Sequence, residues 1–304
     1  MERTVSMYWR PFRVLLVALL VVMAIGAPPA HATTVDLSGT VALSNCSGSL
    51  VTLAGLPASA PALVLTNGHC LEEGFPEPGE VIVDEPTQRT FTVLGGDGRE
   101  LGTVRASRLV YATMTGTDAA LYQLSARYTD IERAYGVTAL ELAVDRPRAG
   151  TSIAVASGYW KWTYRCSIDG FAAELHEGSY VWQDSIRYTP ECQTIGGTSG
   201  SPIIDVTTGK VVGVNNTGNE SGQHCTMNNP CEVDESGQVT VRKGIGYGQQ
   251  THLLAAYLSG AGDFEGPGGQ LARLGGELAG LGGGLAGLSG GLAGLSGGLA
   301  QDQL

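Results

Sequence analysis

Three short segments of the chain carry the residue types that acyl transfer requires. His69 lies in Thr66–Cys70, directly after an apolar run. Asp118 opens another apolar run, and Ser199 stands in a glycine-rich turn before a third. A serine hydroxyl attacks a carbonyl well only when a base takes its proton. Imidazole titrates near neutral pH, and a carboxylate behind the ring fixes its tautomer. The three segments together predict a hydrolytic site that uses an activated serine.

Each of the three positions has an alternative reading. Asp130 also precedes an isoleucine, but it lies in a charged stretch without an apolar strand behind it. Ser201 is two residues from Ser199 and is the fallback nucleophile. His69 could be a core histidine or, with Cys70, a metal ligand. We favour Asp118 because an apolar strand-like run follows it, and Ser199 because Gly200 follows it and Gly197 stands two residues before it; His69 is favoured over its alternatives.

The elements that must position these residues have the pattern of β-strands. Between residues 38 and 250, short apolar or alternating runs are bounded by Gly, Pro, Asn, Asp and Ser, which is typical of an all-β sandwich or barrel. Examples are residues 50–53, 62–65, 81–83, 91–94, 119–124, 153–156, 202–204 and 211–214. Residues 249–258 have helical spacing and predict a short C-terminal helix, whereas 126–135 is ambiguous.

These motifs resemble those of the chymotrypsin-like serine proteases. Cys46–Val51 resembles the family's Cys-Gly-Gly-Ser-Leu-Ile, and Thr66–Cys70 its Thr-Ala-Ala-His-Cys. Gly197–Pro202 resembles Gly-Asp-Ser-Gly-Gly-Pro, in the Ser-Gly-Ser-Pro form of bacterial glutamyl-endopeptidase-like members. The order His, Asp, Ser is also the family's, which argues against an esterase of the α/β-hydrolase type, whose order is Ser, Asp, His. The resemblance, from about residue 46 to 257, implies two six-stranded antiparallel β-barrels.

The resemblance also implies roles for the site residues. His69 would be the general base, Asp118 its orienting partner and Ser199 the nucleophile that forms an acyl-enzyme. The backbone N–H groups of Gly197 and Ser199 would form the oxyanion hole. The substrate-binding residues would be Gln193, Thr194, Asn215, Asn216, Thr217 and Gly218.

The residues at the expected pocket depart from the family's two charged types. Gln193 stands where trypsin-type enzymes have Asp, so a pocket for Arg or Lys is not expected. Thr194 matches a pocket residue of the glutamyl endopeptidases, but Asn215 replaces their pocket His. A neutral Asn supplies no positive charge to a Glu side chain, so the sequence also gives little support to acidic specificity. Residues 216–218 would be the edge on which substrate backbone pairs as a strand.

Six cysteines fit three disulfides. The resemblance implies Cys46–Cys70. Cys225 and Cys231 would close a small loop, which leaves Cys166 and Cys192 as the third pair. The alternative is a zinc site from His224, Cys225 and Cys231, although it lacks a Cys-x-x-Cys pair. No cofactor and no metal are expected.

The activation mechanism of trypsin-type enzymes is not expected here. Thr198 precedes the nucleophile, where those enzymes have an Asp that pairs with a newly cut N-terminus, and no Ile-Val-Gly-Gly start exists. We therefore expect activity as soon as the chain has folded. The aromatic run 159–164 alternates at strand period and is more typical of barrel-edge packing than of a binding surface.

The first 32 residues have the pattern of a signal peptide. Arg3, Arg10 and Arg13 precede an apolar run from Val14 to about residue 27, and Ala30-His31-Ala32 offers a cleavage site. The run is shorter than the ~20 residues that span a bilayer. We expect a secreted protein with no stable membrane insertion after cleavage, in a compartment that permits disulfides.

Residues 261–304 form a low-complexity tail after a protease domain at 33–260, with barrels at 33–140 and 141–260. The unit Leu-x-Gly-x-Leu-Ala-x starts at Leu274, Leu281, Leu288 and Leu295. Repeated glycines disfavour a helix, so we expect a flexible tail, with weak self-association or wall contact as the alternative.

Composition sets limits on the function. The formal net charge of -11 comes without basic clusters, which argues against nucleic-acid binding. The sequence thus predicts a secreted serine endopeptidase that acts on protein or peptide substrates. The alternative is a catalytically silent relative that serves in binding or adhesion.

Overall fold

Two closed rings of antiparallel strands form the described part of the protein, a computed structural model that covers residue 1 and residues 35–254. In the first ring the strand order is β1-β5-β6-β7-β3-β2, and β2 pairs back with β1. These strands are β1 (Thr40–Ala42), β2 (Ser47–Thr52), β3 (Pro61–Thr66), β5 (Thr90–Leu94), β6 (Glu100–Thr113) and β7 (Ala119–Arg127). Outside the ring, β4 (Val81–Pro86) pairs with β6, and β8 (Leu140–Glu141) pairs in parallel with β2.

The second ring has the order β11-β16-β13-β12-β9-β10, and β10 pairs back with β11. Its strands are β9 (Ser152–Ser157), β10 (Trp162–Glu177), β11 (Tyr180–Tyr188), β12 (Pro202–Asp205), β13 (Val211–Gly218) and β16 (Gly246–Gln250). From β10 the sheet extends to β14 (Cys231–Val233) and β15 (Val239–Thr240). The expected all-β fold with two six-stranded antiparallel barrels, as in the chymotrypsin-like fold, is confirmed.

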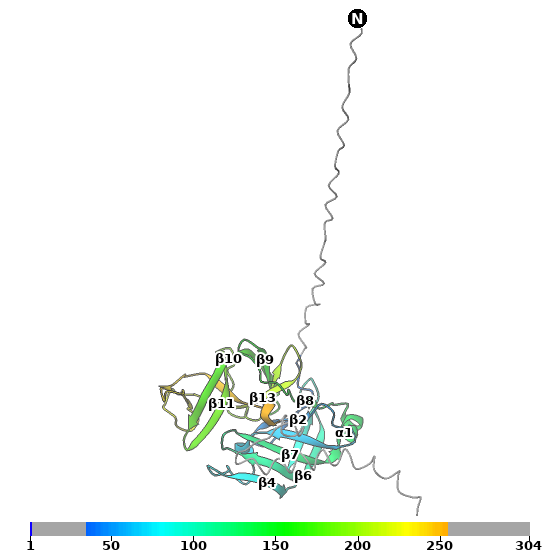
Figure 1. Cartoon of the computed structure of the whole chain (residues 1–304). Coiled ribbons are helices and arrows are strands. Elements are labelled where there is room, and N and C mark those ends of the chain that lie inside the picture. The colour runs from blue at the N-terminus through cyan, green and yellow to red at the C-terminus, as the bar shows by residue number, and fades with distance from the viewer. Residues whose placement is uncertain (2–34, 255–304) are drawn as a thin grey trace, which may run out of the picture. The chain divides into compact units, whose positions relative to one another are not determined.

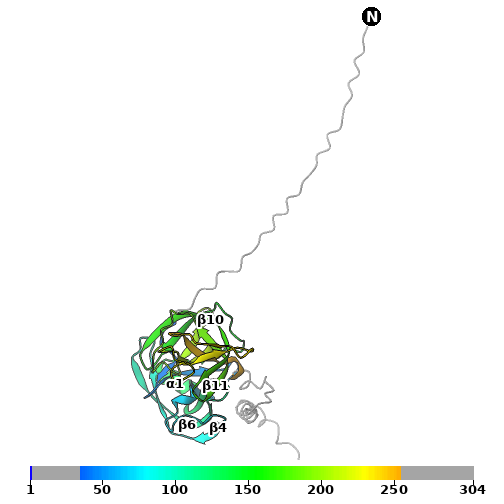
Figure 2. The same cartoon turned by 90° about the vertical axis from the view of Figure 1, so that its left-hand side faces the viewer.

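The apolar side chains fill each ring and also the space between the two. Along β3, Ala62 and Val64 point into the first ring, while Leu63 and Leu65 join a core cluster that includes Ala154 and Val214 of the second. Because both faces of β3 are buried, its sequence is a continuous apolar run and does not alternate. Figure 1 and Figure 2 both show β10 at the opposite end of this domain from β4 and β6.

Helical structure is sparse in the described residues. The ambiguous segment 126–135 forms α1 (Tyr128–Tyr135), and a short 3-10 helix, η1 (Gly68–Cys70), follows β3. Of the helix expected at 249–258, Gln249 and Gln250 instead belong to β16, Thr251 is in neither a helix nor a strand, and residues 252–254 are helical. Residues 255–258 lie outside the described residues. The expected signal peptide and C-terminal tail also lie outside them. No helix in the described part is long and apolar enough to cross a membrane.

Candidate active site

Strand pairing brings His69 and Asp118 together. His69 lies in η1 at the end of β3, and Asp118 directly precedes β7. These strands are neighbours, with Thr66 opposite Ala120. The His69 Nδ1 atom lies 2.6 Å from Oδ2 of Asp118, and the His69 backbone N–H donates to Asp118 Oδ1 at 3.1 Å. The Asp118 side chain is completely buried, so its carboxylate is held in one orientation behind the ring.

The protonation of His69 is set by two opposing effects. Burial lowers its pKa, whereas the Asp118 charge, the hydrogen bond to Asp118 and the charge of Glu177 raise it. The net pKa is above the usual 6.5. With its Nδ1 proton donated to Asp118, the neutral ring keeps a free lone pair on Nε2. This is the tautomer that a general base requires.

Asn67 links the Asp118 strand to the Ser199 loop. Its Nδ2 donates to the Asp118 carbonyl at 2.7 Å, and its Oδ1 accepts from the Gly200 N–H at 2.5 Å. The side chain is completely buried. Sequence reasoning had Asn67 inside the His69 motif but assigned it no role. The signal that could have found it is its place in a motif where the family has Ala.

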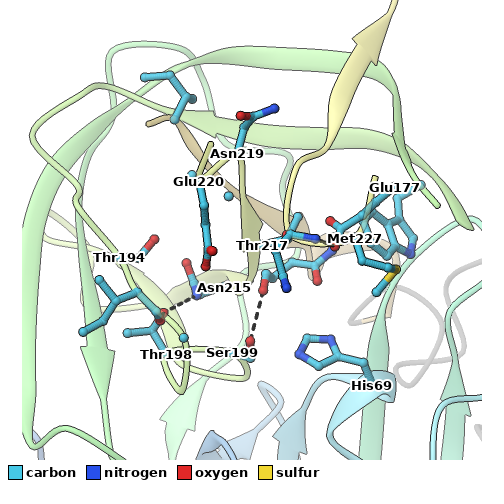
Figure 3. Close-up of a pocket in the computed structure, with 18 of the residues that line it drawn as sticks. His69, Glu177, Thr194, Thr198, Ser199, Asn215, Thr217, Asn219, Glu220 and Met227 are labelled. Carbon is cyan, nitrogen blue, oxygen red and sulfur yellow. Dashed lines mark hydrogen bonds between the residues drawn. The ribbon is translucent and has the colours of Figure 1, made fainter. Parts of the chain in front are cut away.

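Ser199 lies on the loop before β12, next to Gly200. Gly200 has φ +81°, and a Cβ there would overlap the Ser47 carbonyl and the Thr66 hydroxyl, so only glycine fits. Figure 3 shows the His69 ring on the same side of the cleft as Ser199, and both residues line it. The Ser199 hydroxyl donates to the Asn216 carbonyl at 3.1 Å. Within the described residues, no hydrogen bond joins it to His69.

The loop that carries the expected oxyanion hole is held by an aromatic side chain. Gly197 has φ +88°, and a Cβ there would meet Tyr159 and Trp160. The Trp160 indole Nε1–H donates to the Gly196 carbonyl at 2.8 Å. In residues 35–254, the N–H groups of Gly197 and Ser199 have no hydrogen-bond acceptor, so both are available to a bound ligand. Part of the aromatic run therefore positions this loop.

The rivals of the three residues lie elsewhere. Asp130 is in α1, where its carboxylate accepts from the backbone N–H of Arg127 at 3.2 Å. Ser201 is completely buried and does not line the cleft. The metal-ligand alternative for His69 requires a Cys70 thiolate, but Cys70 is bonded to Cys46.

Five of the six expected substrate-binding residues line the cleft. Thr194, Asn215 and the segment 216–218 do so, whereas Gln193 does not. Asn215 is fully engaged: its Oδ1 accepts from Tyr188, and its Nδ2 donates to Thr198 Oγ1, both at 3.1 Å. Asn215 therefore serves as a wall of the pocket, and its amide is held by its neighbours.

The cleft contains residues that sequence reasoning missed. Glu177, Glu220, Met227 and Asn228 line it together with His69 and Ser199. They come from the end of β10 and from the loop after β13. No motif marks them, because their proximity to His69 and Ser199 depends on closure of the second ring.

The six cysteines form three disulfides: Cys46–Cys70, Cys166–Cys192 and Cys225–Cys231. The loop closed by Cys225–Cys231 lies beside the cleft and carries Met227 and Asn228. The alternative zinc site is excluded by this pairing, because both of its cysteines are used in one disulfide.

Comparisons with known proteins agree with this geometry. A family model described as "Trypsin-like peptidase domain" matches residues 46–214. No curated protein matches the chain significantly. The chain is similar to the MamO protease domain from Magnetospirillum magneticum at 13% identity, over 73% of this chain and 97% of that one, with a TM-score of 0.44.

Two further solved structures are similar to a comparable degree. For Nocardiopsis protease the identity is 15%, the coverage 72% of this chain and 94% of that one, and the TM-score 0.40. For Cellulomonas bogoriensis chymotrypsin the identity is 17%, the coverage 73% and 94%, and the TM-score 0.39.

Proposed function

The chain belongs to the trypsin-like peptidase family, and on this premise we propose that it is a secreted serine endopeptidase that works through an acyl-enzyme. The observation that carries the proposal is the 2.6 Å contact between His69 Nδ1 and Asp118 Oδ2, with Ser199 lining the same cleft. A serine nucleophile requires a base in the correct tautomer, and a buried carboxylate fixes the tautomer of the imidazole that acts as this base.

The chemistry follows from these residues. As the Ser199 oxygen bonds to the substrate carbonyl carbon, His69 Nε2 takes the hydroxyl proton, and Asp118 stabilises the imidazolium. The carbonyl oxygen becomes an oxyanion, to which Gly197 and Ser199 donate their N–H groups; each donor is worth about 2.7–4 kcal/mol. The oxyanion then collapses: the C–N bond breaks, His69 gives its proton to the leaving amine, and the acyl group stays bonded to the Ser199 oxygen. Water repeats the sequence on the acyl-enzyme and frees Ser199.

One observation favours a different function, that of a catalytically silent relative used for binding. The Ser199 hydroxyl donates to the Asn216 carbonyl instead of to His69. Catalytic hydrogen bonds are often absent before substrate binds, and rotation about the Cα–Cβ bond redirects the hydroxyl. We therefore propose that substrate binding releases Ser199 from Asn216.

Labelling with a fluorophosphonate separates the two functions, because only an activated serine reacts. We expect the folded, oxidised protein to be labelled at Ser199 and the Ser199→Ala variant to stay unlabelled. Ser201→Ala is the matched control and should label normally, since Ser201 is buried away from the cleft. An unlabelled wild-type protein would sink the peptidase proposal.

Three further features belong to the proposal. The Ser-Gly-Ser-Pro form of the motif supports a place in the bacterial secreted branch that resembles glutamyl endopeptidases, and residues 1–32 support export. Thr198, whose hydroxyl accepts from Asn215 and donates to the Ile195 carbonyl, supports activity without a new N-terminus. N-terminal sequencing of the exported, active protein tests the last two features, export and activity without a new N-terminus. We expect the active protein to begin at residue 33. If it becomes active only after a further cut at a later residue, the proposal is contradicted.

A further inference from the structure

A substrate strand has one place to pair in the cleft. β13 pairs with β16 as far as Gly218, but its pairing with β12 reaches only Val214. Residues 216–218 therefore leave the edge beside Ser199 without a partner strand in the described domain. An extended peptide can add to such an edge. Its successive side chains then point to opposite faces of the strand.

The residues that line the cleft lie on two sides of Thr217, which the two faces of a substrate strand would meet (Figure 3). On one side of Thr217 lie Thr194, Asn215 and Glu220, which we call the primary pocket; on the other lie His69, Glu177 and Met227, the second pocket. The scissile residue, whose carbonyl Ser199 attacks, would place its side chain in the primary pocket. The preceding residue would place its side chain in the second.

Each pocket contains one carboxylate. Figure 3 shows the Glu220 side chain extending between Thr194 and Asn215, and no ion pair neutralises it within residues 35–254. Neither Lys nor Arg occurs among the described residues that line the cleft. The cleft is therefore acidic on both sides of the substrate-pairing edge.

The Glu177 carboxylate is incompletely satisfied. Glu177 is 3% exposed, and its Oε1 accepts from the Asn228 N–H at 2.8 Å. Burial raises the pKa of Glu177, while the Thr217 side chain and the Asn228 N–H lower it. No further partner reaches the buried Oε2, and both amide atoms of Asn216, which lines the same cleft, are also buried without a partner in the described structure. Leaving a buried carboxylate oxygen unpaired is costly. A cationic group that enters the second pocket would favour the ionised form of Glu177 by charge attraction and so offset part of that cost.

The walls of the second pocket suit a long basic side chain. Met227 lies near Glu177 in Figure 3, and the buried Met114 lines the same cleft. Apolar side chains of this kind cover the methylene stem of Lys or Arg while its charged end reaches a carboxylate. Glu177 itself is fixed: it ends β10, and its partner Asn228 belongs to the loop closed by the Cys225–Cys231 disulfide.

We propose that the cleft selects substrates with two consecutive basic residues before the scissile bond, with Glu220 as counter-ion in the primary pocket and Glu177 in the second. This inference rests on the proposed peptidase function. Trypsin-type enzymes have an Asp in the pocket where this chain has Gln193. In our proposal Glu220, in the loop after β13, supplies that carboxylate instead. The motif likeness to glutamyl endopeptidases does not extend to the charge of the substrate.

The test uses four quenched-fluorescence peptides of one sequence, with Arg or Gln at the scissile residue and at the preceding residue. At neutral pH, wild-type protein should cleave the Arg-Arg peptide with the highest kcat/KM. We expect a preference for Arg of about 30-fold or more at the preceding residue, where the carboxylate is buried. At the scissile residue we expect about two- to fivefold, because Glu220 is exposed.

Two isosteric variants assign the preferences. Glu177→Gln keeps the acceptor for Asn228 and should remove the preference at the preceding residue alone, and Glu220→Gln should remove it at the scissile residue alone. Glu73→Gln, an exposed residue outside the cleft, is the control for charge. Fluorophosphonate labelling of every protein shows that each site is intact.

The outcomes separate the two proposals. If wild-type protein does not label, the peptidase function itself fails. If it labels but cleaves the four peptides equally, or prefers Gln at either position, only the dibasic selection is overturned. The dibasic selection is also overturned if the preference at the preceding residue survives in Glu177→Gln, or if the preference at the scissile residue survives in Glu220→Gln. It is overturned as well if one of these variants removes both preferences.

Discussion

Substitution of Asn67 tests how the site is assembled, because this one side chain joins the segment that carries Asp118 to the loop that carries Ser199. In Asn67→Ala, the Asp118 carbonyl loses the donor at 2.7 Å, and the Gly200 N–H loses the acceptor at 2.5 Å. The Gly200 N–H keeps a second acceptor, the Asn215 carbonyl at 2.9 Å. The two losses are therefore unequal.

The magnitude follows from that difference. An orphaned buried carbonyl costs about 1–3 kcal/mol, and a lost hydrogen bond with a remaining partner about 0.5–1.5 kcal/mol, so the free energy of unfolding should fall by about 2–4 kcal/mol. For a domain of this size, that corresponds to a drop in Tm of about 4–16 °C. Because Asp118 and Ser199 would no longer be held in register, kcat/KM should also fall by about 10- to 100-fold.

Thermal unfolding and peptide hydrolysis measure the two effects. Asn67→Asp keeps the acceptor for Gly200 but replaces Nδ2 with an oxygen that faces the Asp118 carbonyl, so it should lose at least as much as Asn67→Ala. Gln238→Ala, at an exposed residue, is the control. If Asn67→Ala keeps the wild-type Tm and kcat/KM, Asn67 does not couple the two segments and the reasoning is refuted.

Three further perturbations have defined outcomes. Because His69 must be neutral to act as base and its pKa is raised above 6.5, kcat/KM should fall as the pH drops through that raised value. Glu177→Gln, which removes one of the raising charges, should move this acidic limb to lower pH; an unmoved limb in the pH profile would contradict the assignment. Trp160→Phe removes the donor to the Gly196 carbonyl and should lower kcat by about two- to tenfold, whereas Trp162→Phe, 63% exposed, should not; equal effects in a kcat assay would show that the indole N–H does not hold the loop. Replacing both cysteines of a disulfide with serine should cost about 3.5 kcal/mol for Cys46–Cys70, with a separation of 24, and about 2 kcal/mol for Cys225–Cys231, with a separation of 6; the reverse order in urea denaturation would show that loop closure is not the main term.

The residues that we propose select the substrate reach the cleft through contacts that the sequence could not reveal. Spacing from Ser199 along the sequence predicts that both Thr194 and Gln193 lie in the pocket. Thr194 lines the cleft, whereas Gln193 does not. Glu177 lies far before Ser199 in the sequence, and no motif surrounds it, so neither spacing nor a motif could identify it. It reaches the cleft because β10 ends there, with its partner Asn228 in the disulfide-closed loop.

The sequence alone could predict the features that depend on residue type and on short-range spacing. His69, Asp118 and Ser199 are recognisable because nucleophilic catalysis needs those residue types, and short runs between turn residues indicate β-strands whatever their partners. The helix predicted at 249–258 shows the limit: leucine and alanine spacing is local, but pairing with Val214 and Gly213 of β13 keeps Gln249 and Gln250 in a strand.

Only the tertiary structure decided which residues share the cleft. Asn67 and Gly200 are 133 residues apart, and their hydrogen bond exists because the two rings pack together. The acidic character of the cleft likewise arises from Glu177 and Glu220, which come from different parts of the second ring. Residue types and periodicity are properties of short segments, whereas a site between closed sheets is set by pairings between distant ones.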